Sequence, residues 1–175
     1  MNLRVEQGRN LIVVPLLSEP VILRRFRRIW QAVSVWCWAA CMEMILIGNK
    51  HGVPQCKLAA GEFKLDCCVA NTPTGCQRTV QPHRLVPLWL KRDYQQVTER
   101  CSTLSLDEVR NEIDAGRPVE VWLGELESCE PLTGSGHLIV VTGYYPDDPE
   151  EWVVLMDPNP NNEKIEVSLK ALRNG

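Results

Sequence analysis

Helix-forming and apolar residues follow one another without a break in one stretch near the start of the chain. From Trp38 to Ile47 no proline or glycine interrupts the run, and alanine, methionine and leucine fill many of its positions. Gly48 comes next, and we expect it to end the helix, because glycine readily takes the left-handed conformation found there. The pattern predicts a helix whose N-terminal end lies at Cys37.

A second helix is predicted after Ser105. Ser105 and Glu108 have the spacing of a capping box, in which each side chain accepts a hydrogen bond from the other residue's backbone N–H. Apolar residues then recur every three or four positions up to Ile113, and Gly116 ends the pattern. Apolar and polar residues alternate over 119–123, which predicts a strand.

Two runs rich in branched residues, 136–145 and 152–157, flank a turn of proline and acidic residues. They predict an antiparallel hairpin. If the hairpin is centred on the middle of the turn, His137 faces Asp157, with Cβ atoms about 4.5–5.5 Å apart. We then expect Asp157 to accept the Nδ1–H of His137 and to fix the orientation of the ring. A register slip of one residue would put the two side chains on opposite faces.

The remaining pattern fits a single domain of 175 residues without internal repeats. A branched run interrupted by Pro15 predicts an edge strand within residues 10–17. A short helix is predicted at 57–64, whereas the stretches 85–90 and 94–97 fit a helix or a strand equally well. The expected parts of the domain are an N-terminal strand and lead-in (1–30), the helix that carries Cys37 (31–48), a cysteine-rich irregular segment (49–83), and a part built of a helix and a sheet (105–160).

The chain carries a net charge of −3 and is 45% hydrophobic. This balance argues against a nucleic-acid partner and against an anionic membrane. The basic run 24–28 fits a solvated face or a loop prone to processing. The longest apolar run, 11–17, is too short to span a bilayer, and the first seven residues lack the order of a secretory signal. We expect a protein that is cytoplasmic as synthesised, while export by a system that reads other signals stays open, as does the oligomeric state.

Eight cysteines are a high count for this length, and four of them gather in one segment. Cys56, Cys67, Cys68 and Cys76 could be reduced thiols or disulfides formed after export, and their pairing does not follow from sequence. With His83 they could also form a zinc site. The spacings, however, lack Cys-x2-Cys pairs, and adjacent cysteines seldom bind one ion. We therefore expect no metal and no other cofactor.

Cys37 is the candidate nucleophile. At a helix N-terminus the unpaired N–H groups and the helix dipole favour the thiolate, which is the form that attacks carbonyls. A cysteine on an apolar helix is more often structural, so the interpretation depends on partners elsewhere in the chain. His137 and Asp157 provide them, because a base can activate the thiol while an acid orients the base.

Four motifs together resemble those of papain-like cysteine proteases. They are Gln31, Trp-Cys-Trp-Ala-Ala at 36–40, Gly-His at 136–137 and Asp-Pro at 157–158. The set is similar to the bacterial effector-type branch of that family, which includes a plant-pathogen avirulence protease. The resemblance implies an α+β fold in which an N-terminal helical lobe carrying the nucleophile packs on an antiparallel β-sheet lobe, with the site in the cleft between them.

The same resemblance implies roles for four residues. Cys37 would be the nucleophile, His137 the general base and then acid, and Asp157 the orienting residue, while Gln31 would stabilise the oxyanion together with the backbone N–H of Cys37. The expected function is cleavage of a protein or peptide substrate by a cysteine endopeptidase, in the setting of a secreted bacterial effector or toxin. Glutamine deamidation, acyl transfer and a non-catalytic or zinc-binding interaction module stay open, as does activation by a host partner.

Overall fold

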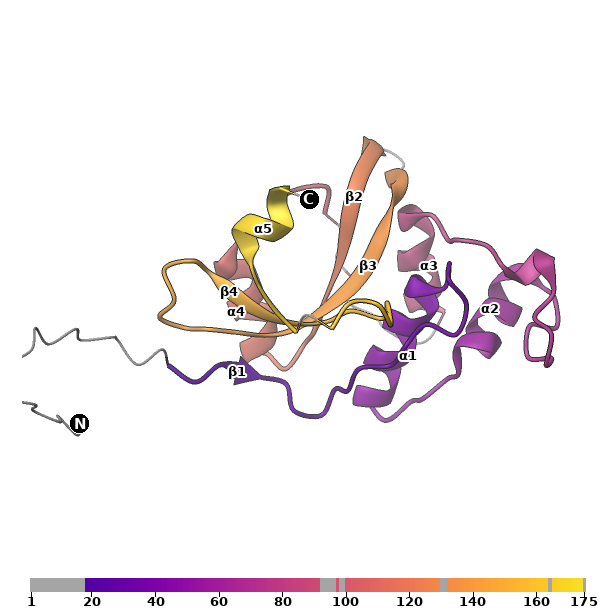
Figure 1. Cartoon of the computed structure of the whole chain (residues 1–175), viewed down its shortest axis with the longest axis horizontal. Helices are drawn as coiled ribbons and strands as arrows, with labels where there is room; N and C mark the ends of the chain where they lie inside the picture. The colour runs from indigo at the N-terminus through magenta and orange to yellow at the C-terminus, as the bar shows by residue number, and fades with distance from the viewer. Residues whose placement is uncertain (1–17, 92–96, 98–99, 130–131, 164, 175) are drawn as a thin grey trace, which may run out of the picture.

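The computed structural model describes residues 18–174 apart from 92–96, 98–99, 130–131 and 164. The strand expected in residues 10–17 lies outside this part of the chain, as does most of the stretch 94–97. The described residues form five strands in one sheet, with helices on both faces (Figure 1). In chain order the elements are β1 (Val21–Ile22), α1 (Cys37–Gly48), α2 (Gln55–Phe63), η1 (Thr74–Cys76), η2 (Pro82–Arg84), α3 (Leu85–Leu90), α4 (Leu106–Asp114), β2 (Val119–Cys129), β3 (Leu132–Tyr144), β4 (Trp152–Met156), β5 (Glu166–Ser168) and α5 (Leu169–Asn174).

The long strand β3 is the centre of the sheet, and all its neighbours are antiparallel to it. β2 pairs along one edge of β3 from Leu132 to Val141, and β1 follows on at Gly143 and Tyr144. On the opposite edge β4 pairs only from Val140 onward. The stretch of β3 that contains His137 therefore has a paired strand on one edge only among the described residues.

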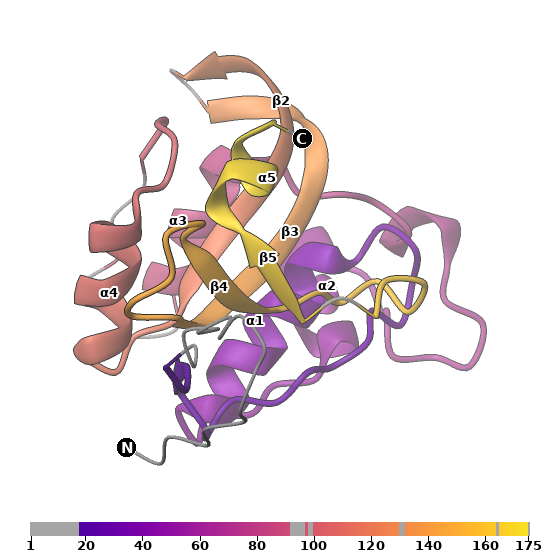
Figure 2. The same cartoon turned by 60° about the vertical axis from the view of Figure 1, so that its left-hand side comes forward.

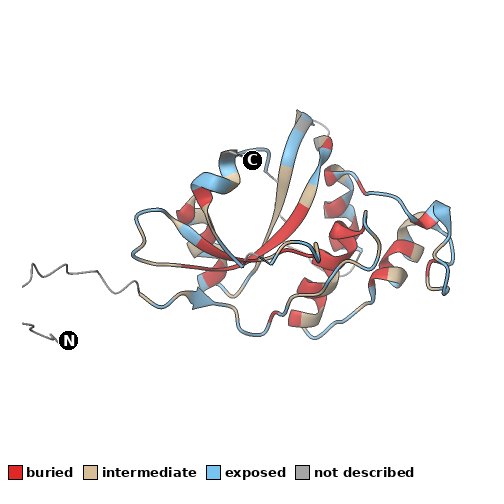
Figure 3. Ribbon diagram, viewed as in Figure 1, coloured by how far each residue is buried: buried red, intermediate tan, exposed pale blue. Residues whose placement is uncertain are grey.

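The sheet separates two clusters of buried side chains. Leu138 and Val140 of β3 pack with α1, whereas Val141 packs with α4 on the opposite face. The two helices lie on different sides of the sheet in both views (Figure 1, Figure 2). Figure 3 shows that burial is continuous from α1 into the middle of β3. The expected α+β fold, with a helical lobe packed on an antiparallel sheet, is confirmed.

The helix predicted from Trp38 to Ile47 is present as α1, but Gly48 does not end it as expected. Gly48 remains within α1, and the left-handed residue is Lys50, at φ 65°. A Cβ built on Gly48 would lie 2.2 Å from the Phe26 ring. Glycine is required there because the chain segment before α1 packs directly on the helix backbone.

Other local predictions agree with the structure. The capping box at Ser105 and Glu108 is formed, and Gly116 follows α4 with φ 78°. The predicted short helix is α2, which begins two residues earlier than expected. The stretch 85–90, which fitted a helix or a strand, is the helix α3.

The predicted register of the hairpin is wrong by two residues. Val141 pairs with Leu155, whereas centring on residue 147 placed it opposite Val153. The turn lies further along the chain than its composition suggests, and the register shifts again at a bulge between Val141 and Gly143. Because side chains alternate with a period of two, an error of two residues leaves each side chain on its predicted face.

Candidate active site

His137 and Asp157 contact each other, although not in the predicted way. His137 Nε2 lies 2.6 Å from Asp157 Oδ1, and the two side chains are 29% and 4% exposed. Strand β4 ends at Met156, so Asp157 lies just beyond the last paired residue and reaches His137 diagonally rather than from the opposite position. This diagonal approach brings the carboxylate to Nε2, so the expectation of a bond to Nδ1 was wrong.

Both oxygens of Asp157 are held by the loop that follows it. The backbone N–H of Asn159 donates to Oδ1 at 2.7 Å, and Asn162 Nδ2 donates to Oδ2 at 2.6 Å. Burial opposes ionisation, but the hydrogen bonds from His137, Asn159 and Asn162 outweigh it and hold the pKa of Asp157 below its ordinary value. The carboxylate is therefore ionised and fixed in orientation.

The sequence interpretation missed Asn159 and Asn162. The signal for the Asn159 bond was the Asp-Pro-Asn-Pro-Asn-Asn run at 157–162, since an aspartate side chain in a turn commonly accepts a hydrogen bond from the backbone N–H two residues on. The same loop is joined to the segment before α1, because the backbone N–H of Gln31 donates to Pro158 O at 2.9 Å. The loop that follows Asp157 and the segment that leads into α1 are thus adjacent.

The environment of His137 favours its protonated form. The hydrogen bond to Asp157 and then the hydrogen bond to Cys37 raise the pKa of His137 to about 9, against the opposing effect of burial. Asp157 contacts Nε2, so Nδ1 is the other ring nitrogen of His137. His137 contacts Asp157 directly, and Cys37 is near enough to contribute to the raised pKa of His137.

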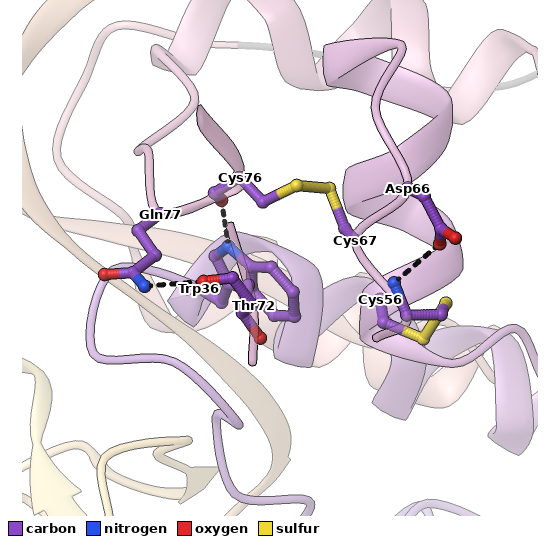
Figure 4. The surroundings of a disulfide bond; sticks show 8 residues. Trp36, Cys56, Asp66, Cys67, Thr72, Cys76 and Gln77 are labelled. Carbon is purple, nitrogen blue, oxygen red and sulfur yellow. Dashed lines mark hydrogen bonds between the residues drawn. A yellow bond between two sulfur atoms is a disulfide. The ribbon is translucent and has the colours of Figure 1, made fainter. Parts of the chain in front are cut away.

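Cys37 is the first residue of α1 and is 8% exposed. Its backbone N–H belongs to the first helical turn, whose N–H groups have no acceptor within the helix. The preceding residue is anchored: Trp36 is buried, its backbone N–H donates to Val33 O, and its indole N–H donates to Cys76 O at 2.8 Å (Figure 4). The nucleophile position is therefore braced by the cysteine-rich segment.

Three disulfides account for six of the eight cysteines: Cys56–Cys68, Cys67–Cys76 and Cys101–Cys129. Figure 4 shows the Cys67–Cys76 bond beside the Trp36 indole. The four sulfurs that a zinc site would need are bonded to one another, so the structure contradicts the zinc interpretation of this segment. The segment is a disulfide-linked support for the start of α1.

The two free cysteines differ in their surroundings. Cys41 lies one turn after Cys37, is fully buried, and donates to Leu138 O at 3.3 Å. Burial, followed by the negative charge of Glu120, raises the pKa of the Cys41 thiol well above its usual value. Cys41 is therefore an unreactive thiol that packs α1 against β3, whereas Cys37 contributes to the raised pKa of His137.

Gln31 lies in the turn before α1. Its Nε2 donates to Ser34 O at 2.6 Å, and its Oε1 is buried without a hydrogen-bond partner among the described residues. This bond accounts for one of the two N–H groups of the side-chain amide. The structure places Gln31 between the Asp157 loop and the turn that leads into Cys37, and its catalytic role stays a prediction.

An α+β fold with a cysteine at a helix start, facing a histidine and an aspartate on an antiparallel sheet, defines a cysteine peptidase of the papain-like type. Comparison with protein families agrees: the Peptidase_C39 like family matches residues 23–174, and the chain belongs to this family. Among curated proteins, none matches the chain. The family match does not select the effector-type branch.

Proposed function

We propose that this cysteine peptidase is an endopeptidase that works through a Cys37–His137–Asp157 triad. The observation that carries the proposal is the contact of His137 Nε2 with Asp157 Oδ1 at 2.6 Å, beside Cys37, whose interaction with His137 also raises the histidine pKa. A histidine oriented by an acid beside a cysteine is what an activated thiol requires. The raised pKa of His137 supports an imidazolium at neutral pH, which can donate a proton to a leaving group.

In the proposed mechanism the Cys37 thiolate attacks the carbonyl carbon of the scissile peptide bond. The negative charge that develops on the carbonyl oxygen is stabilised by the backbone N–H of Cys37 and the side-chain amide of Gln31. The His137 imidazolium donates its proton to the leaving amine as the C–N bond breaks, which leaves a thioacyl-enzyme. Water then attacks this thioester while His137 takes its proton, and the carboxylate product and the thiolate are released.

The setting that we propose is an oxidising compartment reached after export, as for a secreted bacterial effector or toxin. Three disulfides in one chain of this size support it, because cytosolic thiols are kept reduced. Within the described residues no helix is long and apolar enough to cross a bilayer. The proposed substrate is a protein or peptide, with neither nucleic acid nor membrane as a partner, and an activating host protein is compatible with this setting.

The test is alkylation with substoichiometric iodoacetamide near pH 6, followed by mapping of the labelled cysteine. An ordinary thiol with a pKa of about 8.5 is under about 1% ionised at that pH. We expect selective labelling of Cys37 in the wild type and its loss in His137→Ala, while buried Cys41 stays unlabelled in both and serves as an internal control. Equal labelling of both thiols, or none at Cys37, would contradict an activated pair.

Incubation with an unfolded protein then separates the possible reactions. An endopeptidase produces new N-termini in the substrate, whereas the Cys37→Ala variant should produce none. Release of ammonia without chain cleavage would identify a glutamine deamidase, and incorporation of an added amine would identify an acyltransferase. If either of these results is accompanied by selective labelling of Cys37, the assignment of the triad would stand and the peptidase mechanism would be rejected.

A further inference from the structure

A pocket of about 250 Å³ lies on the helical lobe, between α2 and the chain segment 78–84. Phe63 and Val80 give it an apolar part, and the guanidinium groups of Arg78 and Arg84 lie around it. The chain segments that line the pocket belong to the helical part of the molecule, and the segment 78–84 also contacts β3. None of its residues has a role in the chemistry proposed above.

Two contacts connect this pocket to the segments that carry the catalytic pair. The Phe63 ring packs edge-on against Trp38, the residue after Cys37, with ring centroids 5.9 Å apart. On the other side Gln81 Oε1 accepts a hydrogen bond from Gly134 N at 3.2 Å.

Gly134 precedes His137 by three residues on β3, which corresponds to about 10 Å along an extended strand. An extended substrate has the same spacing per residue. The pocket is therefore within reach of a substrate side chain that lies two to four residues from the cleaved bond.

The charges in the pocket do not balance. Glu62, whose side chain is 5% exposed, is paired with Arg84. Arg78 is exposed, its guanidinium lies 4.4 Å from the centroid of the Phe63 ring, and it has no carboxylate partner among the described residues. After Glu62 is paired with Arg84, the pocket carries one unneutralised positive charge, that of Arg78.

Stacking on Phe63 restricts the Arg78 guanidinium before any ligand arrives. A guanidinium that is held in place loses less conformational freedom when it forms two parallel hydrogen bonds to a carboxylate. Lysine or amide side chains of a substrate could not form this pair. The pocket therefore has the chemistry to select aspartate or glutamate.

We propose that this pocket is a substrate subsite for an acidic side chain, with Arg78 as the residue that determines specificity. The proposal rests on the peptidase function proposed above, and it names the substrates as peptides with Asp or Glu within four residues of the cleaved bond. Because Arg78 is partly open to solvent, we expect a preference of about tenfold in kcat/KM for glutamate over glutamine at that position.

The test is digestion of a peptide mixture prepared from unfolded proteins, with the cleavage sites mapped by mass spectrometry. The wild type should show enrichment of Asp and Glu at one position within four residues of the cleaved bonds. Arg78→Gln should lose this enrichment, and Arg78→Glu should reverse it toward lysine and arginine. Arg27→Gln, which removes an exposed arginine outside the pocket, is the matched control and should behave like the wild type.

Labelling of Cys37 by iodoacetamide shows that each variant retains a folded site. Cleavage by the wild type without acidic enrichment would overturn the subsite alone, as would enrichment that survives in Arg78→Glu. Absence of both cleavage and selective Cys37 labelling in the wild type would overturn the peptidase function and the subsite together.

Discussion

Asp157→Asn should change the pH dependence of catalysis rather than only its rate. The hydrogen bond to Asp157 is the largest cause of the rise in the His137 pKa from 6.5 to about 9, and the bond to Cys37 is the second. The whole rise corresponds to about 3 kcal/mol at 1.36 kcal/mol per pKa unit. Asparagine keeps the shape of the side chain and removes its charge, so the larger part of the rise, about one to two units, should be lost.

The direction of the change follows from the proton that His137 must donate. Because its pKa is raised, His137 is protonated at neutral pH, and it loses this proton as the pH rises through about 9. In Asp157→Asn the imidazolium is lost at a lower pH, because the carboxylate that is the largest cause of the raised pKa is gone. The alkaline limb of the kcat/KM profile should therefore move from near pH 9 to between about 7 and 8.

The assay is hydrolysis of a fluorogenic peptide, chosen from the mapped cleavage sites, between pH 5 and about 10. Asp147→Asn is the matched control, because it makes the same chemical change at an exposed position in the hairpin turn and should leave the profile unchanged. An alkaline limb that stays near pH 9 in Asp157→Asn would refute the assignment of Asp157 as the group that holds His137 protonated.

The remaining predictions concern stability. Asn162→Ala leaves a buried carboxylate oxygen without its donor, so the free energy of unfolding in urea should fall by about 1–3 kcal/mol. Gly48→Ala forces a methyl group into an aromatic ring and should cost about 1–3 kcal/mol. Gly61→Ala, where nothing lies within 4 Å of the added Cβ, should be neutral or stabilising in the same assay. Replacing Cys67 and Cys76 together by serine should cost about 2–4 kcal/mol and reduce the labelling rate of the nucleophile; an unchanged rate would show that the disulfide does not brace the start of α1.

Local features of the chain were predictable because their causes lie within a few residues. The helix after Cys37, the capping box at Ser105 and the pair of strands around the 146–151 turn each follow from neighbouring side chains. The meeting of His137 and Asp157 was also predictable, since it needs only the correct face of each strand.

Features that depend on contacts between distant segments were not predictable. The bulge after Val141 shifts the hairpin register. The role of Gly48 depends on Phe26, which lies in a separate segment. The disulfide pairing likewise became visible only when the folded chain brought the cysteines together.

The residues of the proposed triad come from separate parts of the chain: Cys37 opens α1, whereas His137 lies on β3 and Asp157 just after β4. During synthesis the cysteine leaves the ribosome about a hundred residues before the histidine. Until β3 is complete, the thiol has no base beside it. The nascent chain and any fragment that ends before the hairpin should therefore be harmless to their surroundings, and the order of residues along the polypeptide delays the reactivity of the enzyme until the domain has folded.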